Sequence, residues 1–384
     1  MAAALKDQFG LEVIATLAQR IAAVFPDFPQ RAFVAQARRG FESLDLMARG
    51  RHLARVLRQH LPQDPPAALE ILRLSLGPKL KSSEGNGMAP FFYLPHSACV
   101  AEFGLDAYEP ALRLQYDLTQ RFTAEFCLRP FLEHYPERTL ERLRLWARDQ
   151  SAHVRRLVSE STRPRLPWAP RLTQLRVHQQ AVLDLLEMLK DDPEDYVRRS
   201  VANHLNDLGK EHPALLRQLA ARWLKGASPE RIALVRHALR SLVKHGDREA
   251  LQLLGYGPAA QVEIGALDIS PRRAQVGEWV RVSLSLRNPR RTTQNLLIDL
   301  RVAFVKAKGE PRPKVFKLKR LTLAAGETAT LQKSISLAQH TTRTHYAGRH
   351  EVELLVNGTA LPLGHFLLTE AKPRPRGRKA EPHP

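Results

Sequence analysis

The period of the apolar residues changes once along this 384-residue chain, near Tyr256, and divides it into two unlike parts. Before that point apolar residues recur every three or four positions, as in ALLRQLAARWLKG and VLDLLEMLK, which predicts amphipathic helices. After it, alternating stretches such as EWVRVSLSLRN, NLLIDLRVAFVKA and HEVELLVNG predict short strands joined by turns. We therefore expect a mainly α chain: a helical array followed by an all-β module.

The helical part also repeats. Aligning RDQSAHVRRLVSE, KDDPEDYVRRSVANHLND and GASPERIALVRHALRSLVKHGD places Val154, Val197 and Val235 in one column. The spacings, 43 and 38 residues, are typical of HEAT-like α-solenoids. The arginines beside each valine fall on another helix face. Two interpretations stay open for them: pairing with the turn aspartate, or contact with a phosphate backbone.

These patterns suggest three segments. A HEAT-like helical repeat domain covers residues 1–258, an immunoglobulin-like β-sandwich of seven or so strands covers 262–370, and a disordered basic tail covers 371–384. Within the first, GMAPFFYLPHSACVAEFG at 87–104 interrupts the helical pattern with prolines, glycines and aromatic residues. We interpret it as a long loop whose aromatic side chains pack on the core.

Charge points to the kind of partner. The chain has 59 Lys and Arg against 39 Asp and Glu, a net charge of +20, which favours a polyanion, nucleic acid ahead of an anionic membrane. Cys99 and Cys127 lack disulfide-framework or zinc-ligand spacing, and the N-terminus lacks the apolar run of a signal peptide. We expect a cytoplasmic monomer, associated with the nucleoid when bound to DNA, that spans no membrane and uses no metal or other cofactor.

Carboxylates are the candidate catalytic groups, because the sequence has no phosphate-binding loop, nucleophile elbow, metalloprotease motif or dinucleotide fingerprint. Glu125, in LTQRFTAEFCLRPFL, shares an i, i+4 stripe with Arg121 and Arg129. Asp207, in VRRSVANHLNDLGK, shares a similar stripe with Arg199. From spacing alone, each is as well explained by an ion pair within its helix as by catalysis.

Three segments resemble the AlkC branch of the AlkC/AlkD-like DNA alkylation repair glycosylases: LTQRFTAEFCLRPFL, ARDQSAHVRRLVSESTRPRLPWAPRL and YVRRSVANHLNDLGKEHP. The resemblance extends over nearly all of residues 1–258, and SESTRPRLPW is its most specific part. Ser161 stands there where glycine is common in the family, a small change. The C-terminal module is similar to the immunoglobulin-like domain of a subset of that branch.

The resemblance implies a monofunctional DNA glycosylase that removes cationic N3-alkylated bases, chiefly 3-methyladenine and also 3-methylcytosine, from double-stranded DNA without fully extruding the base. Matched by motif, Glu125 and Asp207 fall on catalytic acidic positions and Trp168 on the aromatic residue that lies against the lesion. The cations that we expect to face DNA come from these motifs, from the repeats and from the basic sandwich loops: Arg155, Arg156, Arg163, Arg165, Arg199, Arg343, His345 and Arg349.

The expected chemistry fits these residue types. An N3-alkylated base already carries a positive charge and leaves without a general acid, so the barrier is the oxocarbenium-like sugar, which a carboxylate stabilises while it orients water. A non-catalytic nucleic-acid-binding scaffold is the alternative. A protein-interaction solenoid ranks below both because it leaves the charge of +20 unexplained. Carboxylates far apart, or locked in arginine pairs away from the groove, would contradict the catalytic interpretation.

Overall fold

The computed structural model describes residues 5–82, 85, 87–257, 260–339 and 344–370. The chain divides into two compact units. The helical unit comprises Met1–Leu216 and Arg222–Ala238, and the strand-rich unit comprises Arg217–Ala221 and Leu239–Pro384. The second unit thus includes short helices that precede the strands, and the domain boundaries expected from the sequence remain predictions.

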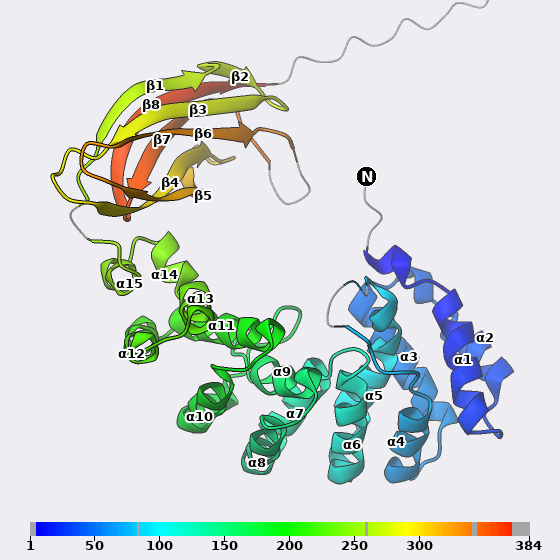
Figure 1. The fold of residues 1–384 in the computed structure, drawn as a ribbon. Helices are drawn as coiled ribbons and strands as arrows, with labels where there is room; N and C mark the ends of the chain where they lie inside the picture. The colour runs from blue at the N-terminus through cyan, green and yellow to red at the C-terminus, as the bar shows by residue number, and fades with distance from the viewer. Residues whose placement is uncertain (1–4, 83–84, 86, 258–259, 340–343, 371–384) are drawn as a thin grey trace, which may run out of the picture. The chain divides into compact units, whose positions relative to one another are not determined.

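Helices account for nearly all the regular structure before residue 254 (Figure 1). Several begin on a proline, whose missing N–H costs nothing in the first turn of a helix. The helices of the described residues are α1 (Glu12–Val24), α2 (Gln30–Ala37), α3 (Leu46–His60), α4 (Pro65–Leu74), α5 (Leu94–Phe103), α6 (Tyr108–Thr119), α7 (Glu125–His134), α8 (Pro136–Trp146), α9 (Ala152–Ser161), α10 (Gln179–Leu189), α11 (Asp195–Gly209), α12 (Pro213–Leu224), α13 (Pro229–Ala238), α14 (Arg240–Lys244) and α15 (Arg248–Leu253), with short 3-10 turns η1 (Leu5–Gln8), η2 (Phe41–Ser43), η3 (Ala89–Tyr93), η4 (Leu105–Ala107) and η5 (Gln174–His178).

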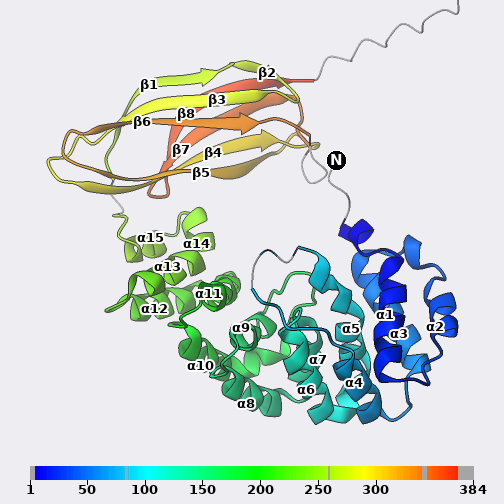
Figure 2. The ribbon, with the colours of Figure 1, turned by 45° about the vertical axis from the view of Figure 1, so that its right-hand side comes forward.

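Two rows of helices build the helical unit. The odd-numbered helices from α3 to α13 lie next to one another in sequence order, and α4, α6, α8 and α10 form the second row (Figure 2). The repeat column expected from the sequence is confirmed: Val154, Val197 and Val235 lie in α9, α11 and α13 and are at most 1 % exposed. Stacking these helices therefore places equivalent residues of successive repeats side by side.

The segment at 87–104 is not the long loop that its composition predicted. η3 and α5 cover most of it, and Pro90 and Pro95 sit in their first turns. The prolines thus begin these helices instead of breaking them. The expectation that its aromatic residues pack inward holds for Tyr93, which is buried, whereas Phe91 is half-buried.

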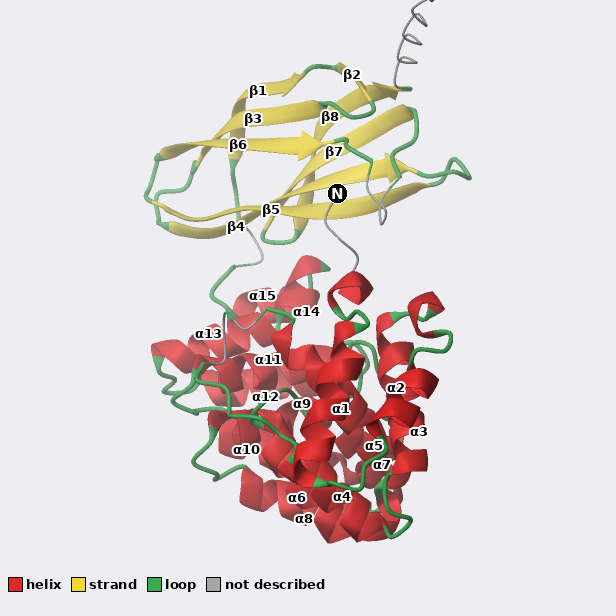
Figure 3. Ribbon diagram, turned by 90° about the vertical axis from the view of Figure 1, so that its right-hand side faces the viewer, coloured by secondary structure: helices red, strands yellow, loops and turns green. Residues whose placement is uncertain are grey.

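The strand-rich unit contains two sheets (Figure 3). One has the strand order β1-β3-β6 and the other β2-β8-β7-β4-β5, and all pairings except that of β2 with β8 are antiparallel. The strands of the described residues are β1 (Glu263–Ser270), β2 (Arg273–Gln275), β3 (Trp279–Arg287), β4 (Gln294–Val305), β5 (Pro311–Leu323), β6 (Thr328–Ser336), β7 (Gly348–Val356) and β8 (Thr359–Thr369).

Alternation of buried and exposed side chains along the strands explains the core of this unit. Val280, Val282 and Leu284 of β3 are buried at every second position, and Ile298 and Leu300 of β4 belong to the same cluster from the other sheet. Two sheets that bury alternate side chains against each other form a sandwich. This confirms the expected fold class, a helical array followed by an all-β module. No helix among the described residues is long and apolar enough to cross a membrane.

Candidate active site

Glu125 is the first residue of α7, where the helix dipole favours a carboxylate. Its side chain does not pair within its own helix. Oε2 accepts a hydrogen bond from Nη1 of Arg156 in α9 at 2.7 Å and another from the hydroxyl of Thr123. The stripe partner Arg129 instead donates to backbone carbonyls, so the ion pair within α7 that spacing suggested is not formed.

Asp207 lies in the last turn of α11 and is paired with an arginine of the loop after α9 and with the lysine that ends its own helix. Its Oδ2 accepts from both Nε and Nη2 of Arg163, at 2.9 and 2.7 Å, and its Oδ1 accepts from Nζ of Lys210 at 2.9 Å. Arg199, its stripe partner, instead faces Asp195 at 3.7 Å. Both predicted carboxylates are therefore bound by arginines that come from other segments of the chain.

Glu160 joins these two pairs into one chain of charges, and the sequence analysis assigned it no role. Its Oε1 accepts from Nη1 of Arg163 at 2.5 Å and lies 3.6 Å from Nη2 of Arg156. Glu125, Arg156, Glu160, Arg163 and Asp207 thus form a continuous series, which we call the carboxylate chain. The i, i+3 and i, i+4 spacing of Glu160 to the two arginines is the signal that could have revealed it.

Burial sets the electrostatics of the carboxylate chain. Desolvation alone would raise the pKa of Glu160, but Arg156, Arg163 and the hydroxyl of Ser200 outweigh it and hold the pKa below its usual range. Desolvation likewise disfavours the charge of Arg156, yet Glu125 and Glu160 prevail and its pKa is raised. Glu160 at the centre of the cluster is therefore ionised near neutral pH, and two arginines bridge the three carboxylates.

One carboxylate oxygen stays available to a ligand. Of the groups that the structure describes, none donates a hydrogen bond to Oε1 of Glu125, whereas the oxygens of Glu160 and Asp207 all have partners. A carboxylate that is held in place with one oxygen available can stabilise a developing positive charge or accept a proton from water. Arginine pairing holds this group in place without occupying all of it.

The loop after α9 is anchored by Arg129 of α7. Its guanidinium donates to the carbonyls of Ser161, Arg163 and Pro170 at 3.2, 2.9 and 2.5 Å, so it fastens both ends of the segment that carries Trp168. Leu166 and Leu172 bury the loop against the helices. Sequence reasoning placed Arg129 in a stripe with Glu125 and missed this role.

Trp168 projects from that loop into solvent. The residue is 59 % exposed, and its backbone has a φ of +64°, in the left-handed region that a tryptophan rarely adopts. On one side it meets Phe91, with ring centroids 6.2 Å apart, and Phe91 in turn packs on Phe122 at 5.3 Å. The structure thus presents a large apolar ring on a supported but exposed position.

The other predicted DNA-facing arginines of the helical unit differ in what they do. Arg155 donates to both oxygens of Asp192 at 2.6 and 3.0 Å and is largely buried, so it matches the structural interpretation of the repeat arginine. Arg165 is half-buried and pairs with Glu211 at 3.0 Å. Arg199 is 69 % exposed. Arg156 and Arg163 belong to the carboxylate chain and have little exposed surface.

The three predicted residues of the sandwich loops also differ. Arg349 is exposed and paired with Glu351 at 2.7 Å. His345 is buried, and its ring packs against Phe304 with centroids 5.2 Å apart, so its side chain is not at the surface. The basic composition of the loops did not indicate that the side chain of His345 is buried. Arg343 lies outside the described residues.

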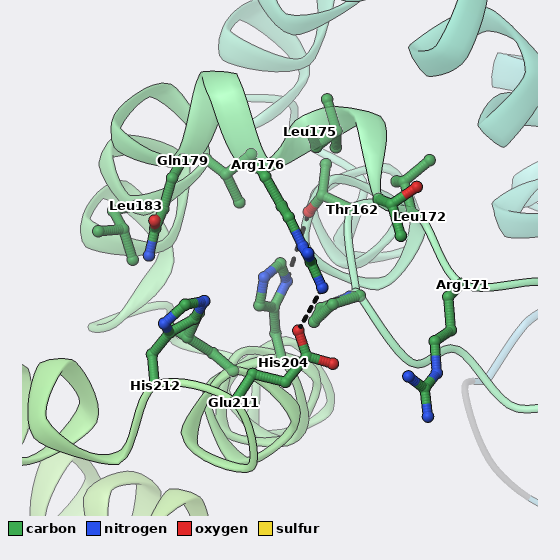
Figure 4. A pocket seen from close by; sticks show the side chains of 14 residues that line it. Thr162, Arg171, Leu172, Leu175, Arg176, Gln179, Leu183, His204, Glu211 and His212 are labelled. Atoms are coloured by element: carbon green, nitrogen blue, oxygen red, sulfur yellow. Dashed lines mark hydrogen bonds and ion pairs between the residues drawn. The ribbon is translucent and has the colours of Figure 1, made fainter.

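A pocket lies beside the carboxylate chain, between the loop after α9 and helices α10 and α11 (Figure 4). Its lining includes Thr162, Arg176, His204 and Glu211, and Nδ1 of His204 bonds the carbonyl of Ser159 at 3.0 Å. Burial lowers the pKa of His204 to about 4, so the imidazole is neutral near pH 7. His204 therefore adds no charge to the cluster.

Known proteins share both parts of this architecture. Residues 117–245 match the family described as "DNA alkylation repair enzyme", and residues 263–370 match the C-terminal Ig-like domain of YhaZ. The YhaZ protein of Bacillus subtilis (strain 168), described as uncharacterized, is 35% identical over 92% of this chain and 96% of its own length. The structure of Pseudomonas fluorescens alkylpurine DNA glycosylase AlkC, bound to DNA containing an abasic site analog, is 36% identical, with a TM-score of 0.89, and covers 96% of this chain and 100% of that one.

A DNA alkylation repair enzyme domain in the helical part, followed in the chain by an Ig-like domain, places this protein in the class of DNA alkylation repair enzymes. Within that class, this chain belongs to the AlkC family. The resemblance expected from its motifs is confirmed.

Proposed function

We propose that this protein is a monofunctional DNA glycosylase that excises cationic N3-alkylated bases, chiefly 3-methyladenine and also 3-methylcytosine, from double-stranded DNA and leaves an abasic site. The observation that carries the proposal is the carboxylate chain, which gathers acidic residues from α7, α9 and α11 and leaves Oε1 of Glu125 without a hydrogen-bond donor from the described part of the chain. The likeness to AlkC, itself described as an alkylpurine DNA glycosylase, supports it.

The chemistry follows from where the charge develops. The alkylated base departs as a neutral molecule and leaves a cationic deoxyribose, so no general acid is required. Glu125 stabilises that cation and orients the attacking water, while Asp207 contributes a second, fixed negative charge at the other end of the chain. Arg156 and Arg163 hold both groups in position before DNA arrives.

Recognition is divided between an aromatic ring and surface cations. Trp168 lies against the lesion nucleotide, and its exposed ring gains cation–π attraction of about 1–2 kcal/mol from a desolvated cationic base. The exposed or half-buried cations Arg165, Arg199 and Arg349 contact phosphates and fix the register without reading sequence. Arg155 and His345 are not in this set because their side chains are committed to the interior.

The test is base release from methylated duplex DNA, with products separated by chromatography. We expect 3-methyladenine above the spontaneous rate for the full chain, and a loss of about 10²- to 10³-fold in Glu125→Gln and Asp207→Asn with DNA affinity retained. Glu141→Gln, which removes one negative charge from the exposed surface of α8, is the matched control.

The scaffold alternative makes the opposite prediction. If this protein only bound nucleic acid, both carboxylate substitutions would leave its behaviour unchanged, and no base would be released above background. Release by the wild type that survives both substitutions would instead assign catalysis to other residues.

A further inference from the structure

Two buried serines stand behind the carboxylate chain. The hydroxyl of Ser200, in α11, donates to Oε2 of Glu160 at 2.5 Å, and the hydroxyl of Ser159, in α9, donates to Ser200 at 2.6 Å. Both residues are at most 2 % exposed. The other oxygen of Glu160 is held by Arg163. Neither serine has a part in the function proposed above.

Glu160 determines which way the hydrogen bonds from Ser159 to Ser200 and from Ser200 to Glu160 run. An ionised carboxylate accepts hydrogen bonds and donates none, so the proton of Ser200 must point to Glu160. The oxygen of Ser200 is then an acceptor, and Ser159 supplies its proton. A donor of this kind, bonded to an ionised group in a buried site, is worth more than a bond between neutral groups.

We infer that Ser200, supported by Ser159, is a positioning residue that holds Glu160, and through Arg156 and Arg163 the two outer carboxylates, in the geometry that base excision requires. The inference rests on the proposed function. Ser200 fixes Oε2 while Arg163 fixes Oε1, so the carboxyl plane of Glu160 cannot rotate. Each arginine that Glu160 contacts also contacts an outer carboxylate.

Several charged and titratable groups face Glu160 besides the serines. Arg156, Arg163, Tyr196 and His204 interact with it directly, from α9, the loop that follows it and α11. Glu125 of α7 and Asp207 of α11 lie beyond the two arginines. Ser200 bonds the ionised form of Glu160, so its removal raises the pKa of that carboxyl. The ionised form is then lost at a higher pH, and the acidic limb of the pH–rate profile moves upward. Titration of His204 cannot imitate this shift, since Ser200 does not bond it.

The experiment measures single-turnover base release against pH for the full chain and four variants. We expect Ser200→Ala to slow release about 10-fold at neutral pH and to move the acidic limb up by about one pH unit, with DNA affinity unchanged. Ser159→Ala should shift both quantities in the same direction by less, about 2- to 3-fold in rate. Ser200→Thr, which keeps the hydroxyl, should restore the wild-type profile to within about 3-fold.

Ser161→Ala is the matched control, because it removes a buried hydroxyl of α9 that donates to the carbonyl of Leu157 in its own helix and not to the carboxylate chain as the structure describes it. Alanine is favourable inside α11, and Ser159 keeps the carbonyl of Arg156 as an acceptor at 3.2 Å, so Ser200→Ala should fold. An active wild type with Ser200→Ala and Ser159→Ala profiles like that of Ser161→Ala overturns this inference alone. A wild type that releases no base overturns the proposed function, and the inference with it.

Discussion

The repeats that contain α9 and α11 share a Val-Arg-Arg run and use its second arginine in opposite ways. The first arginine behaves alike in both: Arg155 and Arg198 each donate to the backbone carbonyls six and five residues before them, in the turn that precedes the helix. The second does not. Arg156 has an 18 % exposed side chain among carboxylates, whereas the side chain of Arg199 is 69 % exposed and lies 3.7 Å from the exposed Asp195.

The neighbours explain the difference. Glu125 of α7 faces Arg156, and Glu160, six residues after the repeat valine, lies on its other side. The equivalent position in the α11 repeat is Asn203, which carries no charge to hold Arg199 inward. The first arginine, which bonds the turn before its helix, therefore has the same structural role in both repeats. The second arginine joins the carboxylate chain only in the α9 repeat, where acidic residues lie next to it.

Among the arginines of the two repeats, Arg156→Gln should have the largest effect. It leaves Glu125 and Glu160 without the cation that bridges them, and breaking a buried ion pair typically costs about 3–5 kcal/mol of unfolding free energy. The pKa of Glu160 should rise, because Arg156 is the largest favourable influence on its ionised form. We expect base release to fall by about 10²-fold at a temperature where the variant is folded.

Chemical denaturation and single-turnover kinetics measure the two effects separately. Arg156→Lys should recover part of the stability but less of the activity, since an ammonium cannot reproduce the planar guanidinium between two carboxylates. If Arg156→Gln were as stable and as active as Arg199→Gln, the contrast between the two repeats would have no functional meaning.

Arg155→Gln should separate stability from activity. The side chain of Asp192 is only 3 % exposed and would lose its bidentate partner, so we expect a loss of about 2–3 kcal/mol in unfolding free energy. Base release by the folded fraction should stay within about 3-fold of the wild type, because Arg155 does not touch the carboxylate chain. If base release by Arg155→Gln fell sharply while its unfolding free energy stayed the same, Arg155 would belong with the cations that contact DNA. Arg198→Gln is a milder companion, since its partner Asp195 is exposed.

Local sequence patterns predicted the architecture because the spacing of apolar residues reflects which side chains are buried. The period of the apolar residues separated helices from strands, and the repeat alignment identified three valines that are buried in successive helices. The segment at 87–104 was misread because proline breaks a helix in its interior but begins one in its first turn.

The site was harder to foresee because its contacts join distant residues. Glu125 and Arg156 are 31 residues apart in the sequence, and Arg163 and Asp207 are 44 apart. Helical spacing suggested partners within each helix instead. Motif resemblance identified the two outer carboxylates. The spacing of Glu160 to Arg156 and Arg163 carried a signal that our sequence analysis did not use, whereas composition does not indicate that His345 is buried against Phe304 in the sandwich.

Arg199→Gln should have the smallest effect on stability of these variants, and we expect it to act on DNA affinity instead of on base release. Its loose, exposed pairing with Asp195 contributes little to folding, so the unfolding free energy should change by less than about 0.5 kcal/mol. If Arg199 neutralises one phosphate, removing it reduces the slope of log affinity against log salt by about 0.9, and affinity for undamaged and methylated duplexes falls alike. Arg144→Gln, on α8, is a matched control with a 57 % exposed side chain and an equally loose pairing, 3.9 Å from Asp184. Fluorescence anisotropy across a salt series measures the slope of log affinity against log salt for both variants. If that slope were unchanged in Arg199→Gln as well as in Arg144→Gln, Arg199 would be a solvated surface cation with no role in binding DNA.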